Sequence, residues 1–156
     1  MSQRAQQLHA SADGQVAELA ERLSAAGTAG LARPCPGRER LGDGTVGAVA
    51  VHTTDNYHRI ARLIVAIRDG GGHHEPSQHG EEHRASEVEL DVLLARLAAA
   101  REALATIGRL TDEQLDSVPP ASDVRFVDGE RTLEQIVASM LKHQRHQVDA
   151  LAAGLS

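Results

Sequence analysis

The chain has 156 residues, of which 41% are hydrophobic and 24% charged, a composition typical of one globular domain over residues 1–156. Its net charge is −6 and its basic residues are scattered, which argues against a nucleic-acid partner. Tyr57 and Phe126 are its only aromatic residues, so it lacks stacking platforms for bases. The N-terminus has no apolar signal core and no segment is long enough to span a membrane, so we expect a cytoplasmic protein without a membrane partner.

The first predicted element is an amphipathic helix over residues 5–26. Its hydrophobic residues recur at steps of three and four, which is the helical period. They are Leu8, Ala12, Val16, Leu19 and Leu23. Residues 27–44 then contain repeated glycines and prolines, so we expect a long first connection. The single cysteine, Cys35, excludes an internal disulfide and is expected to be an exposed, inert thiol.

The second predicted helix covers residues 45–68, and its inward stripe is polar in the middle. The stripe consists of Val49, His52, Asn56, Ile60, Leu63 and Ile67. Asp55 lies one turn from His52, where it would either orient the imidazole or be an ordinary surface acid. Residues 69–84 are rich in Gly, His and Glu, so we expect a mobile, solvated loop. Its four histidines, His73, His74, His79 and His83, have irregular spacing and suggest no fixed metal site.

Two more long helices complete the expected fold. Ser86 with Glu89 has the spacing of a capping box and predicts the start of the third helix, and residues 111–120 predict a short capped helix stopped by prolines. Residues 124–131 alternate and contain Asp-Gly, which is compatible with a small hairpin. Thr132 with Gln135 predicts the cap of the last helix. The sequence therefore predicts an all-α four-helix bundle.

The last helix contains a cluster of polar residues where hydrophobic residues are expected. Continuing its inward stripe from Met140 gives His143 and Gln147, with His146 displaced to one side. His52 occupies a similar position on the second helix. Facing imidazoles inside a bundle are a common way to bind zinc, nickel or iron. The alternative is that these histidines lie at the solvated rim of one end of the bundle.

Two segments carry a resemblance to a known family. RPCPGRERLGDGTVGAVAVHTTDNYHRI is a Pro-Gly loop that runs into a helix with an inward His, and FVDGERTLEQIVASMLKHQRHQVDAL is a turn that runs into a last helix with a His cluster. With the helices between them, these segments resemble the DinB/YfiT-like four-helix proteins, and the similarity covers nearly the whole chain. This family is related to mycothiol-dependent maleylpyruvate isomerase N-terminal domains and thiol S-transferases.

The resemblance implies a divalent metal (zinc, nickel or iron) bound by one His of the second helix and an H-x-x-x-H pair on the last. By position His52 and His143 match two of these ligands. Gln147 stands where the third His is expected. Three interpretations stay open: His146 supplies the third ligand, Gln147 binds weakly, or the metal has been lost.

In several branches of the family the metal ionises a low-molecular-weight thiol that attacks an electrophile. Arg outnumbers Lys 15 to 1, which indicates a GC-rich bacterial genome, and in actinobacteria that thiol would be mycothiol. Our first hypothesis is a metal-dependent transferase or isomerase that activates a thiol or water toward a small-molecule substrate. The second is a metal-free enzyme in which His52, Asn56, His143 and Gln147 supply acid–base and hydrogen-bonding groups. The third is a non-catalytic binding or dimerisation module, and a homodimer is left open.

Overall fold

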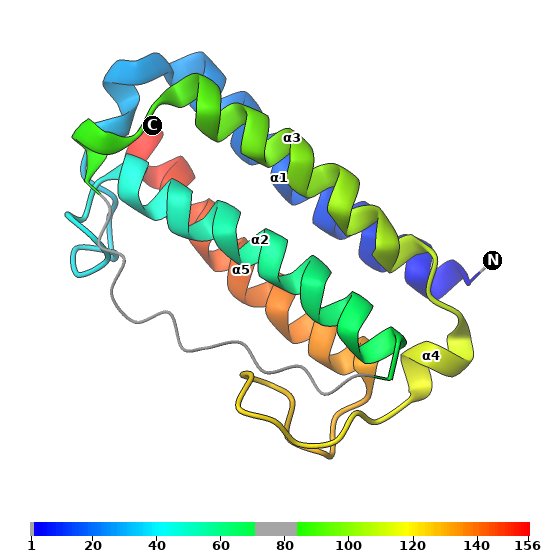
Figure 1. Ribbon diagram of the computed structural model, residues 1–156. Coiled ribbons are helices and arrows are strands. Elements are labelled where there is room, and N and C mark those ends of the chain that lie inside the picture. The colour runs from blue at the N-terminus through cyan, green and yellow to red at the C-terminus, as the bar shows by residue number, and fades with distance from the viewer. Residues whose placement is uncertain (1, 71–83) are drawn as a thin grey trace.

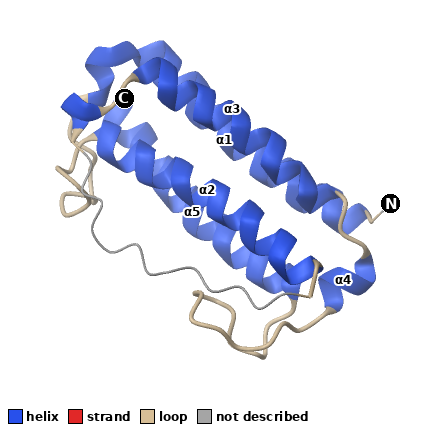
Figure 2. Cartoon of the chain, in the orientation of Figure 1, coloured by secondary structure: helices blue, strands red, loops and turns tan. Residues whose placement is uncertain are grey.

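The computed structural model describes residues 2–70 and 84–156, which form a bundle of four long helices with no β-strand in these ranges (Figures 1 and 2). The long helices are α1 (Gln3–Leu31), α2 (Val46–Arg68), α3 (Leu90–Gly108) and α5 (Leu133–Leu155). A single 3-10 turn, η1 (Ala85–Glu87), precedes α3, and the short helix α4 (Asp112–Asp116) lies between α3 and α5. The predicted all-α bundle is confirmed.

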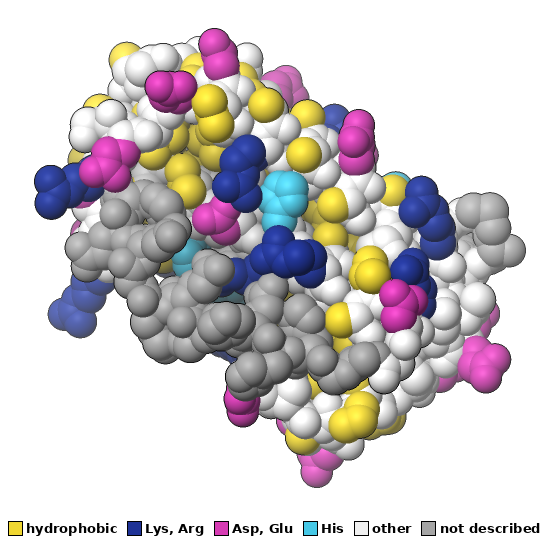
Figure 3. Space-filling model, viewed as in Figure 1, with side chains coloured by type: hydrophobic (Ala, Val, Ile, Leu, Met, Phe, Trp, Pro, Cys, Tyr) yellow, Lys and Arg dark blue, Asp and Glu magenta, His cyan; other side chains and the backbone are white. Residues whose placement is uncertain are grey.

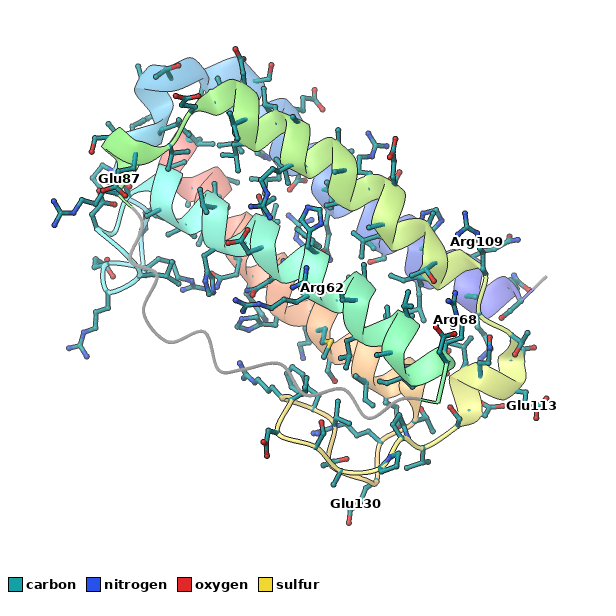
Figure 4. All side chains as sticks on the ribbon, in the orientation of Figure 1. Arg62, Arg68, Glu87, Arg109, Glu113 and Glu130 are labelled. Atoms are coloured by element: carbon teal, nitrogen blue, oxygen red, sulfur yellow. The ribbon has the colours of Figure 1, made fainter. Side chains whose placement is uncertain are left out.

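Helix α1 packs against α3 and α5, and α2 packs against the same two helices, so α1 and α2 lie diagonally across the bundle. An ion pair at 2.8 Å between Asp13 and Arg101 joins α1 to the antiparallel α3. Arg68, at the end of α2, donates to the Thr106 hydroxyl near the end of α3 at 3.3 Å, so these two helices run parallel. Figure 4 accordingly shows Arg68 and Arg109 at one end of the bundle and Glu87 at the other.

This topology refines the expected connections. Residues 32–45 form the predicted first connection, but the one between α2 and α3, residues 69–89, is longer and joins opposite ends of the bundle. The predicted mobility of residues 69–84 and the four histidines at 73–83 fall largely outside the described residues.

The caps explain where α5 begins and correct the prediction for α3. Thr132 accepts a hydrogen bond from the Gln135 backbone N–H, and the Gln135 side chain accepts one from the Thr132 N–H, so the predicted capping box of α5 is confirmed. The capping box at Ser86 is wrong, because Ser86 lies within η1 and α3 begins at Leu90 without a side-chain cap.

The predicted hairpin is also wrong. Residues 124–131 form turns, and Phe126 adopts a left-handed backbone with φ of 74° that does not continue a strand. α1 is longer than predicted, because the chain remains helical to Leu31 after a kink at Gly27, where φ is 69°. Glycine permits this conformation, since it has no Cβ to clash with the backbone.

The first connection is folded tightly against the ends of α2 and α5. Its Cys35 is fully buried rather than exposed, and the Cys35 N–H donates to the Gly44 carbonyl at 2.9 Å. Gly154 lies so close to this connection that an added Cβ would be 2.9 Å from the Pro34 carbonyl oxygen. These contacts fix the connection against α5, and Arg38 lies within it, beside α5.

On the face of the molecule in Figure 3, basic, acidic and hydrophobic side chains are interspersed. None of the helices in residues 2–70 and 84–156 combines the length and the apolarity needed to cross a membrane.

Candidate functional site

The predicted inward stripe of α5 is correct for Gln147 but not for His143. The buried stripe of this helix runs through Val137, Leu141, Gln144, Val148 and Leu151, so Gln144 rather than His143 occupies the centre of the bundle. His143 is half-buried beside this stripe and Gln147 is buried, whereas His146 is exposed. The structure therefore does not turn His146 inward as a third ligand.

Helix α2 shows the same offset. Its buried stripe contains Ala50, Thr53, Tyr57 and Ile64, while His52 and Asn56 are half-buried on its flank. The prediction that His52 and Asn56 belong to the core stripe is wrong. His52 and Asn56 of α2, like His143 of α5, instead lie along the edge of the core, within partial reach of solvent.

Gln144 connects the two helices at this level. Its side-chain Nε2 donates to the Thr53 carbonyl oxygen at 2.8 Å, which brings α2 and α5 into contact beside His52 and His143. Its Oε1 is buried and has no hydrogen-bond partner among the described residues. A buried acceptor without a donor is costly, so this oxygen is suited to accept a hydrogen bond from a bound group. The regular spacing from Val137 to Leu151 would have been the sequence signal for Gln144.

A directional chain of hydrogen bonds runs along α2. Arg59 donates from its guanidinium to Asn56 Oδ1 at 3.1 Å, and Asn56 Nδ2 lies 3.2 Å from His52 Nε2. A guanidinium can only donate, so it fixes the orientation of the Asn56 amide. The amide nitrogen must then donate to His52, whose Nε2 accepts, and this pattern assigns the proton of the neutral imidazole to Nδ1.

On α5, Gln147 is held by a residue from the first connection. Arg38 Nε donates to Gln147 Oε1, and Arg38 also donates to the Gly37 carbonyl at 2.9 Å. A permanently charged guanidinium therefore lies next to the Gln147 side chain. Nothing in the sequence pairs these residues, since the Pro-Gly connection has no periodicity.

His143 lies in a positively charged environment. Burial lowers the pKa of its imidazole, and the nearby charges of Arg125, Arg38 and His146 lower that pKa further. All these effects disfavour the imidazolium form, so His143 is held in its neutral state, which can accept a proton or a hydrogen bond.

Two further side chains of α2 contact α3, and Cys35 is buried in the first connection. Asp55 forms an ion pair with Arg96 of α3 at 2.8 Å, so it does not orient His52. His58 has its Nε2 3.0 Å from the Arg96 carbonyl oxygen. Burial raises the pKa of the Cys35 thiol, which agrees with an inert cysteine.

The donor atoms of this site are a poor match for a three-ligand metal centre. No group of three or more His, Cys, Asp or Glu side chains converges within residues 2–70 and 84–156. His52 Nε2 and Gln147 Oε1 already accept internal hydrogen bonds. The third imidazole, His146, is exposed. A metal would have to displace Asn56 and Arg38 from these lone pairs.

Comparisons with protein-family models, with curated proteins and with solved structures find no match for this chain.

Proposed function

We propose that this chain is a metal-free enzyme that binds a small polar metabolite along the α2–α5 edge and acts on it by acid–base chemistry. The observation that carries the proposal is the hydrogen bond from Arg38 to Gln147. It places a fixed cation where the resemblance to DinB/YfiT-like proteins implies a metal ligand, and two adjacent cations would repel each other.

The remaining groups have complementary roles. His143 is neutral and half-buried, as a general base requires. His52 Nε2 is occupied by Asn56, so the proton on its Nδ1 makes His52 a hydrogen-bond donor. The buried Gln144 Oε1 offers an acceptor to a substrate hydroxyl or amide. These groups can bind a polar substrate and move a proton at His143 without a Lewis acid.

A second candidate is the metal-dependent activation of a low-molecular-weight thiol such as mycothiol. One observation favours it: the Gln144–Thr53 hydrogen bond brings α2 and α5 together beside His52 and His143, two of the three ligands that the resemblance implies. Zinc, nickel or iron would be held by these two residues once Asn56 and Arg38 had moved away.

The test begins with metal analysis and with zinc, nickel and ferrous iron titrations of untagged protein. We expect less than about 0.2 metal ions per chain and no tight binding. The double variant Arg38→Gln/Gln147→His removes the guanidinium beside position 147 and restores the H-x-x-x-H pair. It should therefore bind these metal ions more tightly than the wild type, whereas Arg109→Gln should not. A stoichiometric metal in the wild type, lost in His143→Ala, would establish the second candidate instead.

Activity is then screened with a panel of small electrophiles, with and without thiols, in the presence of a chelator. The proposal predicts chelator-resistant turnover that falls in His143→Ala by about 10²–10⁴-fold, the usual contribution of a general base. His146→Ala is the matched control, because this exposed histidine lies on the same helix and should leave turnover unchanged.

A further inference from the structure

Two arginines from separate connections lie near His143, close enough for their positive charges to act on its imidazole. Arg38, from the connection between α1 and α2, donates to Gln147, one turn beyond His143. Arg125, from the connection between α4 and α5, precedes Phe126. Phe126 and Met140 both pack against the small hydrophobic cluster of Leu63, Val127 and Ile136, and Met140 is one turn before His143. The packing thus brings two guanidinium groups toward one short section of α5.

Phe126 holds Arg125 in place at the expense of backbone strain. Its φ of 74° is the only positive φ of a non-glycine residue among the described residues. A bulky aromatic residue rarely adopts this conformation, and such outliers concentrate at functional sites. The Arg125 guanidinium lies 4.8 Å from the Phe126 ring centroid, a distance typical of a cation–π contact.

Neither Arg38 nor Arg125 forms an ion pair with a carboxylate of residues 2–70 and 84–156, although the charge of Arg38 helps to lower the pKa of the neighbouring Glu39 carboxyl. Arg131 provides the contrast, because it contacts the same ring at 5.6 Å but forms an ion pair with Asp128 at 2.9 Å. Residues 37–41 also line a surface depression of about 400 Å³, so Arg38 borders a space that a ligand can enter.

We propose that Arg38 and Arg125 form an anion subsite beside His143 that binds the carboxylate or phosphate group of the substrate. This inference rests on the proposed function and specifies that its small-metabolite substrate is an anion. A guanidinium presents two parallel N–H donors to an oxyanion, and its charge is permanent. The strained backbone at Phe126 and the contact with Gln147 hold the two side chains before the ligand arrives, which reduces the entropic cost of binding.

The test measures binding without turnover, by calorimetry at constant ionic strength, with inorganic phosphate and with malonate as separate probes. We expect Arg38→Gln and Arg125→Gln each to weaken binding of the preferred probe by about tenfold or more, as for a charge-assisted hydrogen bond. The probe with the lower Kd identifies the ligand group as phosphate or carboxylate. Arg131→Gln and Arg109→Gln are the matched controls and should remain within about twofold of wild type.

Two further variants keep the test decisive. Arg125→Lys retains the charge without the planar fork and should bind between wild type and Arg125→Gln. Phe126→Gly accommodates the positive φ but removes the ring, so it should weaken binding of the anionic probe while the far-UV circular dichroism spectrum stays unchanged. Wild-type affinity in both Arg38→Gln and Arg125→Gln, or an equal loss in Arg109→Gln, would overturn the subsite.

The two proposals can fail separately. Arginine-dependent binding in a protein that shows no chelator-resistant turnover would remove the proposed reaction and keep the subsite. Turnover that depends on His143 but is insensitive to both arginine substitutions would support the proposed reaction and remove the subsite.

Discussion

The Tyr57 hydroxyl of α2 donates to Gln15 Oε1 of α1 at 2.8 Å, and Gln15 Nε2 donates to the Leu141 carbonyl oxygen of α5 at 3.0 Å. One buried amide therefore joins the diagonal pair α1 and α2 and reaches a third helix. Tyr57 is fully buried, and this burial raises the pKa of its hydroxyl well above the ordinary value, so the group remains a neutral donor.

Removing this donor should destabilise the fold. We expect Tyr57→Phe to lower the free energy of unfolding by about 1–3 kcal/mol, because it leaves Gln15 Oε1 buried without a partner. Urea denaturation measures the change. In the double variant Tyr57→Phe/Gln15→Met the orphaned acceptor is gone, so the combined loss should be smaller than the sum of the single losses by at least about 0.5 kcal/mol. Strict additivity would show that the two side chains are not coupled.

The two predicted capping residues, Thr132 and Ser86, provide a matched pair of substitutions. Thr132→Ala removes a cap that the structure shows, so we expect a loss of about 0.5–2 kcal/mol in unfolding free energy. Ser86→Ala should change it by less than about 0.5 kcal/mol, because Ser86 is exposed and does not cap α3. Equal losses in thermal or urea unfolding would restore the capping box that the Ser86–Glu89 spacing predicts.

Two helical glycines should respond in opposite directions to alanine. Gly14 of α1 is exposed, and an added Cβ would meet nothing within 4 Å, so Gly14→Ala should stabilise the protein by about 0.5–1 kcal/mol. Gly154 of α5 is buried, and its Cβ would lie 2.9 Å from the Pro34 carbonyl and 3.0 Å from Val46. Gly154→Ala should therefore cost about 1–3 kcal/mol. A stabilising Gly154→Ala would mean that the first connection is not packed against α5.

Acid should weaken the contact between α1 and α3. The hydrogen bond and charge of Arg101 hold the pKa of the Asp13 carboxyl below its ordinary value. A group with a lowered folded-state pKa stabilises the protein above its unfolded-state pKa and loses that contribution as the pH falls through the folded-state value. The urea midpoint of the wild type should thus fall between about pH 5 and about pH 2 more steeply than that of Asp13→Asn. Parallel pH profiles for the two proteins would contradict this assignment.

Local patterns in the sequence were sufficient to predict the helices. Hydrophobic residues at steps of three and four located all four long helices, because this periodicity reflects one buried face per helix. The capping boxes at Thr111 and Thr132 lie within four residues of chain, so each is visible without knowledge of the fold. The Ser86–Glu89 pattern failed because Ser86 lies within η1, and Glu89 itself occupies the N-cap position of α3 without a side-chain hydrogen bond.

The site depended on tertiary structure, because its contacts join distant residues. Periodicity located the polar cluster of α5 but could not decide that Gln144, rather than His143, faces the centre. That choice rests on the Thr53 carbonyl, which lies 91 residues away in sequence. Arg38 and Gln147 are 109 residues apart. No local rule predicts that the guanidinium of a residue in the Pro-Gly connection donates a hydrogen bond to the Gln147 amide. The sequence alone thus determined which helices form, whereas their packing decided which polar atoms meet.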